Sequence, residues 1–85
     1  MMTFEQFLAR AAALLRIEWP AGTTRYDNLY EDLGLDSFQV FELLIIVEGL
    51  AESMVPPVEV PDLVTLDDAF GYYERLVALE LADQP

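Results

Sequence analysis

Apolar residues recur at helical spacing in three separate segments of the chain. The first helix is predicted to begin at Thr3, where Gln6 completes a capping box, and to continue to about Glu18. Pro20 then ends it, because proline lacks the N–H group that a helix interior needs. The apolar positions that define this helix are Phe4, Phe7, Leu8, Ala11, Leu14 and Leu15.

A long connection, residues 19–36, follows the first helix and is rich in turn-forming residues. Connections of this length are uncommon in compact domains unless their own side chains fix them in place. We therefore expect its apolar residues to hold it against the core, with a short turn at residues 28–32. These apolar residues are Trp19, Tyr26, Leu29, Leu33 and Leu35.

The second helix is predicted from Ser37 to about Ala51, with Asp36 as its N-cap and Gln39 as the partner in a capping box. Ser37 therefore places a hydroxyl group at a helix N-terminus. A phosphate group is favoured at that place, because the first N–H groups of a helix are unpaired and its dipole is positive there.

The last helix is predicted to begin after Thr65, with Asp67 and Asp68 in its electropositive first turn. Its inward stripe consists of Leu66, Phe70, Tyr73 and Val77. Residues 53–64 before it contain three prolines, so only a helical turn or irregular structure fits there. With no strand pattern, residues 1–85 are predicted to form a single all-α domain. Its architecture would be a small antiparallel four-helix bundle of three main helices and one short helix, with a long first loop.

The second helix has apolar residues on two sides when its positions are placed at about 100° per residue. One side carries the core residues Val40, Leu43, Leu44, Val47 and Leu50. The other carries Phe38, Phe41 and Ile45, flanked by Glu42, Glu48 and Glu52. So small a chain has few elements to cover both sides, which predicts an exposed docking surface. Spacing alone leaves open the alternative that Phe38 and Ile45 pack against a loop.

The charge of the chain restricts its partners. The net charge is −12, from sixteen acidic residues against four basic residues, all of which are arginine. Nucleic-acid binding is excluded because its affinity comes from basic groups, and anionic membrane surfaces are disfavoured for the same reason. We expect a protein partner with a basic patch, bound with marked salt dependence.

Residue types that are missing limit the chemistry. Cysteine, histidine and lysine are all absent. The chain therefore lacks a thiolate, an imidazole base and an amine nucleophile, so no catalytic role and no metal site are expected. The longest apolar runs, such as Leu43–Val47, are far shorter than the roughly 20 residues that span a bilayer. No secretory signal is indicated, and a cytoplasmic location is expected.

A motif around Ser37 resembles a known family signature. The segment Asp-Leu-Gly-Leu-Asp-Ser-Phe at residues 32–38, followed by Glu42-Leu43 and Val47-Glu48, is similar to the signature of acyl carrier proteins. The resemblance extends to Val55-Pro56 and to the helix start Thr65-Leu66. It implies that Ser37 carries a 4′-phosphopantetheine arm, transferred from coenzyme A by a phosphopantetheinyl transferase, and that Asp36 helps to position the site.

The same resemblance implies that the arm holds acyl groups as thioesters and that partner enzymes, such as an acyl-loading enzyme and a ketosynthase, act on them. A monomeric carrier is expected. The positions that match partner recognition in the family are Phe38, Phe41, Glu42, Ile45, Glu48 and Val55.

Two departures from the family pattern refine this hypothesis. Phe38 replaces the usual leucine after the serine, and Pro56, Pro57 and Pro61 interrupt a segment that is acidic in fatty-acid carriers. Both favour a dedicated carrier of secondary metabolism, such as polyketide biosynthesis. Residues 33–36 favour an acyl over a peptidyl carrier, although aminoacyl cargo remains an alternative. An acidic helical adaptor that is never modified is the other alternative.

Overall fold

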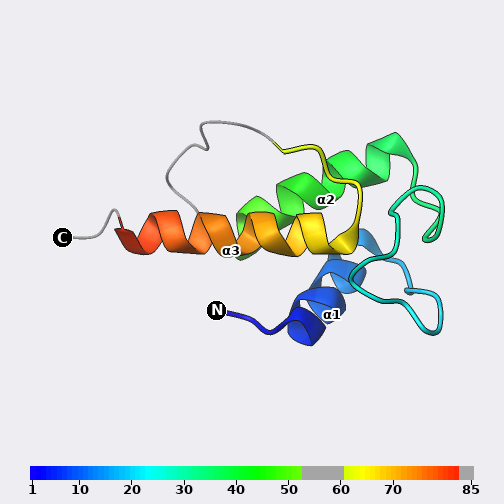
Figure 1. Ribbon diagram of the computed structural model, residues 1–85, viewed down its shortest axis with the longest axis horizontal. Helices are drawn as coiled ribbons and strands as arrows, with labels where there is room; N and C mark the ends of the chain where they lie inside the picture. Colours follow the sequence, from blue (N-terminus) through cyan, green and yellow to red (C-terminus); the bar gives the residue numbers. More distant parts are fainter. Residues whose placement is uncertain (53–60, 83–85) are drawn as a thin grey trace.

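The computed structural model describes residues 1–52 and 61–82, and three α-helices make up the fold of these residues (Figure 1). The helices are α1 (Phe4–Leu15), α2 (Ser37–Leu50) and α3 (Leu66–Ala82). Helix α2 packs against both α1 and α3. No strand occurs in this part of the chain, and the predicted all-α class is confirmed. None of these three helices is both long and apolar enough to cross a membrane.

Each helix begins at the cap that the sequence predicts. In all three, the cap side chain accepts a hydrogen bond from the N–H group three residues later, and that residue's side chain accepts one from the N–H group of the cap. The pairs are Thr3 with Gln6, Asp36 with Gln39, and Thr65 with Asp68. These reciprocal bonds satisfy N–H groups that have no partner inside the helix.

Helix α1 ends at Leu15, so the prediction that it continues to about Glu18 is wrong. Arg16 adopts a left-handed backbone conformation with a φ of 61°, which ends a helix by turning the chain away from its axis. After this turn, Trp19 returns to α1, and its indole N–H group donates to the carbonyl oxygen of Leu8 over 2.9 Å. Helix α1 therefore ends where the chain turns back at Arg16 so that Trp19 can contact the helix.

Aromatic rings join α1 to α3. The ring centroid of Phe7 lies 5.3 Å from that of Phe70 and 5.8 Å from that of Tyr73. Aromatic pairs of this kind contribute about 0.5–1.5 kcal/mol each beyond the area they bury. The predicted inward stripe of α3 is confirmed, since Leu66, Phe70 and Tyr73 are buried and Val77 is partly buried.

The long connection between α1 and α2 is fixed to the residues that precede α3. Leu29 is fully buried, and its N–H group donates to the carbonyl oxygen of Val64 over 2.8 Å. An isolated antiparallel bridge pairs Asn28 with Thr65 next to this bond. Leu35 is also buried, and its N–H group donates to the carbonyl oxygen of Leu29 over 2.9 Å. These bonds tie the beginning of α3 to the loop that leads into α2.

The starts of α2 and α3 therefore lie at the same end of the molecule, and the two helices run side by side in the same direction (Figure 1). The predicted antiparallel arrangement is wrong for this pair, because residues 61–65 return to the loop before α3 begins. The predicted short fourth helix falls mainly in residues 53–60, which lie outside the described residues. Residues 61–64 are irregular.

Most of the predicted anchors of the connection are confirmed. Leu29 and Leu35 are buried, while Trp19 and Leu33 pack partly against the core. Tyr26 is the exception, with 74% of its surface exposed. Its neighbour Arg25 anchors the loop instead, because its Nε lies 2.7 Å from Oδ1 of Asp67 on α3. Its guanidinium group also lies over the rings of Phe4 and Phe70.

A side-chain hydrogen bond joins the middle of α3 to the end of α2. Tyr72 is buried, and its hydroxyl group donates to Oε2 of Glu48 over 2.9 Å. Burial of the phenol and the bond to the Glu48 carboxylate raise the pKa of Tyr72 to about 12. A buried phenol needs such a partner, because an unsatisfied hydroxyl group would oppose folding.

Replacing Leu29 with alanine is expected to lower the free energy of unfolding by about 2–5 kcal/mol, because the change leaves a cavity where a fully buried side chain holds the connection. Urea denaturation followed by circular dichroism measures this loss. The matched control is Leu79→Ala on α3, where 45% of the side chain is exposed, and its effect should stay within about 0.5 kcal/mol. Equal losses in the two variants would show that the loop is not anchored through Leu29.

Tyr72 also makes stability sensitive to alkaline pH. Its pKa is about 10 in an unfolded chain and about 12 in the folded protein, so the folded state retains a proton that the unfolded state has lost. The resulting stabilisation is fully present below about pH 10 and is lost as the pH rises through about 12. Urea denaturation at a series of pH values should show this loss in the wild type and in the exposed control Tyr26→Phe, but not in Tyr72→Phe. Parallel pH profiles for all three proteins would contradict the assignment.

Candidate functional site

A turn at the end of the long connection presents Ser37 on the surface. Gly34 has a φ of 72°, a left-handed conformation that glycine adopts with little strain. Leu35 then turns into the core, with only 6% of its surface exposed. Asp36 and Ser37 follow it, and both are exposed. The turn at Gly34 and the burial of Leu35 together place Ser37 on the surface.

Asp36 holds the first turn of α2 in place. Its Oδ1 accepts a hydrogen bond from the N–H group of Gln39 over 2.8 Å, which confirms its predicted role as N-cap. Ser37 is the first residue of α2, and the first turn of this helix contains no acidic side chain. A phosphoryl group on Oγ of Ser37 would therefore lie at the electropositive end of the helix.

The hydroxyl group of Ser37 has few possible activating groups in this chain. Its hydroxyl group makes no hydrogen bond within the described residues, and the chain has no histidine, lysine or cysteine to activate it. No group of three or more acidic side chains in the described residues is placed to hold a metal ion. The exposed hydroxyl group of Ser37 can accept a chemical group from another protein.

An apolar patch extends from Ser37 along α2 and consists of Phe38, Phe41 and Ile45. Their exposed fractions are 69%, 59% and 52%, respectively. The predicted division of α2 into a buried and an exposed apolar side is therefore confirmed. The alternative that Phe38 and Ile45 pack against a loop is wrong for the residues that the structure describes. Exposed apolar side chains gathered on one helix face are typical of a protein interaction surface.

Two of the three glutamates predicted beside this apolar patch, Glu42 and Glu48, differ in their contacts. Both Glu42 and Glu48 are half-buried. Glu48 accepts the hydrogen bond from Tyr72 and is thus directed toward α3. Glu42 makes no hydrogen bond or ion pair within the described part of the chain. Val55, the remaining predicted recognition residue, lies outside the described residues.

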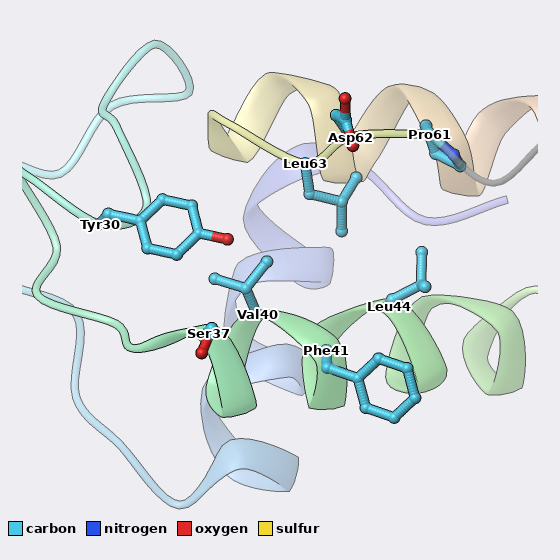
Figure 2. A pocket seen from close by; sticks show the side chains of 8 residues that line it. All are labelled: Tyr30, Ser37, Val40, Phe41, Leu44, Pro61, Asp62 and Leu63. Carbon is cyan, nitrogen blue, oxygen red and sulfur yellow. The ribbon is translucent and has the colours of Figure 1, made fainter.

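A hollow of about 200 Å³ opens between the loop, α2 and residues 61–63 (Figure 2). Its lining residues are Tyr30, Ser37, Val40, Phe41, Leu44, Pro61, Asp62 and Leu63. Figure 2 shows the side chains of Tyr30 and Leu63 reaching toward Val40 from opposite sides. The Ser37 oxygen and the Phe41 ring are directed away from the centre of the hollow in the same view.

Sequence reasoning did not identify Tyr30 and Leu63 as parts of the site. Tyr30 follows the predicted anchor Leu29, so its opposite orientation could have been anticipated. Nothing in the local pattern places residues 61–63 against α2, because that position follows from the bridge between Asn28 and Thr65. The hollow is thus a product of contacts between distant parts of the chain.

Comparison with known proteins identifies relatives over most of the chain. The acyl carrier protein of Campylobacter jejuni subsp. doylei is 32% identical over 76 residues, which cover 89% of this chain and 97% of the relative. The acyl carrier proteins of Campylobacter curvus and Campylobacter concisus are 33% and 35% identical over 57 residues, covering 67% of this chain and 74% of each relative. No family model and no solved structure matches the chain. These identities and coverages show that the chain belongs to the acyl carrier protein family.

Proposed function

We propose that Ser37 is the attachment point of a 4′-phosphopantetheine arm, on which this carrier presents acyl groups to biosynthetic enzymes. The observation that carries the proposal is the exposed hydroxyl group of Ser37 at the first position of α2. A transferase needs access to that oxygen, and the surrounding turn supplies it. The rigid helix behind the serine gives the arm a fixed origin.

The attachment step needs only an acceptor hydroxyl group from this chain. A bond forms between Oγ of Ser37 and the phosphorus of the pantetheine phosphate, while a P–O bond in the pyrophosphate of coenzyme A breaks. Adenosine 3′,5′-bisphosphate leaves, and the transferase takes up the hydroxyl proton. The phosphodiester that results carries a negative charge, which the positive end of α2 stabilises by about 0.3–1 kcal/mol.

The carrier itself is not an enzyme, since acyl carrier proteins are non-catalytic. The terminal thiol of the arm would hold the acyl group as a thioester, and the chain contributes no thiol that could compete for it. The absence of histidine and lysine likewise leaves the thioester without an imidazole base or a lysine amine from this chain. The composition thus suits a carrier whose cargo must survive until a partner acts on it.

The apolar patch Phe38, Phe41 and Ile45 is proposed as the surface that meets the transferase, the acyl-loading enzyme and a ketosynthase. Glu42 and Glu48 would add negative charge next to it, and Val55 is proposed as an apolar contact near the arm. The net charge of −12 favours partners whose docking surface is basic. Apolar contacts would supply most of the affinity, while charge would steer the encounter.

The biosynthetic context is proposed from the departures noted in the motif. Phe38 in place of leucine enlarges the first apolar contact after the serine, and Pro56, Pro57 and Pro61 change the segment before α3. Both support a carrier of polyketide or related secondary metabolism rather than of bulk fatty-acid synthesis. A monomeric protein of the cytoplasm is the corresponding proposal for assembly and location.

Incubation with coenzyme A and a broad-specificity phosphopantetheinyl transferase is expected to add one phosphopantetheine to the wild-type protein. Ser37→Ala should abolish the addition, because it removes the acceptor oxygen. Ser53→Ala replaces the chain's other serine and is the matched control, which should be modified like the wild type. Intact-mass spectrometry reads out all three proteins. Modification that survives in Ser37→Ala, or an unmodified wild type, would favour the adaptor alternative.

Phe41→Ala is expected to raise the KM of the transferase for this carrier about tenfold, since a central apolar anchor contributes about 1–2 kcal/mol to an interface. The midpoint of thermal unfolding should change little, because 59% of the side chain is exposed. Leu81→Ala is a matched control at the far end of α3, where the side chain is 63% exposed. Steady-state kinetics of modification should separate the two variants, and similar KM values would remove the apolar patch from the docking surface.

A further inference from the structure

The loop holds Tyr30 in a defined position beside Ser37. The neighbouring Leu29 is fully buried, and the N–H group of Tyr30 donates to Oδ1 of Asn28 over 2.8 Å. Oδ1 of Asn28 also accepts from the N–H group of Glu31 over 2.9 Å. The backbone on both sides of Tyr30 is therefore fixed, and the ring extends over the hollow rather than into the core (Figure 2).

The hydroxyl group of Tyr30 is an unused hydrogen-bonding group. It makes no hydrogen bond within the described residues, although 45% of the residue is exposed and the rest packs against the structure. Figure 2 shows this hydroxyl group above Val40, on the side of the hollow that faces Leu63. The hollow thus combines apolar walls with three polar side chains, those of Tyr30, Ser37 and Asp62, and none of them has a hydrogen-bond partner within the described residues.

This combination matches the part of a phosphopantetheine arm nearest its phosphate. That part contains a carbon with two methyl groups, followed by an amide. Val40 and Leu63 offer apolar contacts for the methyl groups, and the Tyr30 hydroxyl group can donate to the amide carbonyl oxygen. Ser37 itself lines the hollow, and its exposed side chain can change rotamer to direct Oγ toward it.

The size of the hollow decides what can occupy it. Its volume of about 200 Å³ is below the range of about 300–1,000 Å³ that is typical of pockets enclosing a drug-sized ligand. A long acyl chain attached to the arm would not fit there together with the arm. The available space therefore favours the first segment of the arm over its distal cargo.

We propose that this hollow binds the phosphate-proximal segment of the arm, with the two methyl groups between Val40 and Leu63 and the Tyr30 hydroxyl group bonded to the adjacent amide carbonyl. This inference rests on the proposed attachment at Ser37. Tyr30 is then a positioning residue that limits the directions in which the arm leaves the protein. The acyl group remains outside the hollow, where a partner bound to the apolar patch can reach it.

Nuclear magnetic resonance of the modified protein tests the inference. Intact mass first establishes that the wild type, Tyr30→Phe and the control Tyr26→Phe each carry one phosphopantetheine. Nuclear Overhauser effects are then measured between the methyl protons of the arm and the methyl groups of Val40 and Leu63. The wild type and Tyr26→Phe should show them. In Tyr30→Phe, the ratio of docked to undocked arm should fall roughly two- to tenfold, which is the effect of losing one hydrogen bond.

The outcomes separate the two proposals. A wild-type protein that gains no mass would overturn the attachment at Ser37 and this inference with it. A modified wild type without these Overhauser effects would overturn only the docking of the arm. Tyr30 would have no specific role if the ratio of docked to undocked arm were the same in Tyr30→Phe and the wild type. The same would hold if this ratio fell equally in Tyr30→Phe and Tyr26→Phe. Neither substitution should affect folding, because neither hydroxyl group has a hydrogen bond within the described residues.

Discussion

The attachment of the long connection to the start of α3 is the constraint on which the site depends. The N–H group of Leu29 binds the Val64 carbonyl oxygen, and Arg25 pairs with Asp67 just inside α3. Together with the bridge at Asn28, these contacts place the beginning of α3 beside the loop that leads into α2. Without them, neither the turn that exposes the serine nor the opposite wall of the hollow would have a defined position. A few contacts at the N-terminal ends of two helices thus organise the functional end of the molecule (Figure 1).

Helix α2 serves two surfaces at once. Its buried side, with Val40, Leu43 and Val47, fills the core between its neighbours. Its other apolar side remains largely exposed, because α1 and α3 together cover only one side of it. Exposing large apolar side chains opposes solubility, and the strongly acidic surface of the chain counteracts aggregation by mutual repulsion. Net charge and apolar exposure are therefore complementary features of a protein that must meet several partners and release them.

Glu48 combines a structural hydrogen bond with a position close to the apolar patch. Its bond to Tyr72 fixes the end of α2 against α3 and raises the pKa of the buried phenol. The same carboxylate is half-exposed near the apolar patch. Glu42, which precedes Glu48 by six residues in α2, has no such bond within the described residues. The two carboxylates thus differ in the structure, since that of Glu48 is bonded to α3 and that of Glu42 is not.

The local structure of this protein could be predicted well from its sequence. Helix starts, the short turn at residues 28–32 and the two apolar sides of α2 depend on residues within about one helical turn of each other, and each is confirmed. The end of α1 was misplaced, because the left-handed conformation of Arg16 follows from the return of the chain to the core rather than from its side chain. Tyr26 was misplaced for a similar reason, since Arg25 supplies the anchor that an aromatic residue was expected to provide.

Acyl carrier family membership could also be inferred from local spacing, because the motif around the serine is continuous in the chain. Only the tertiary structure showed that α3 runs in the same direction as α2, that Tyr72 holds Glu48, and that Tyr30 and Leu63 face each other across a hollow. Each of these features joins residues more than twenty positions apart. Periodicity reports which side of a helix is buried, but the choice of its distant neighbours is made by packing of the whole chain.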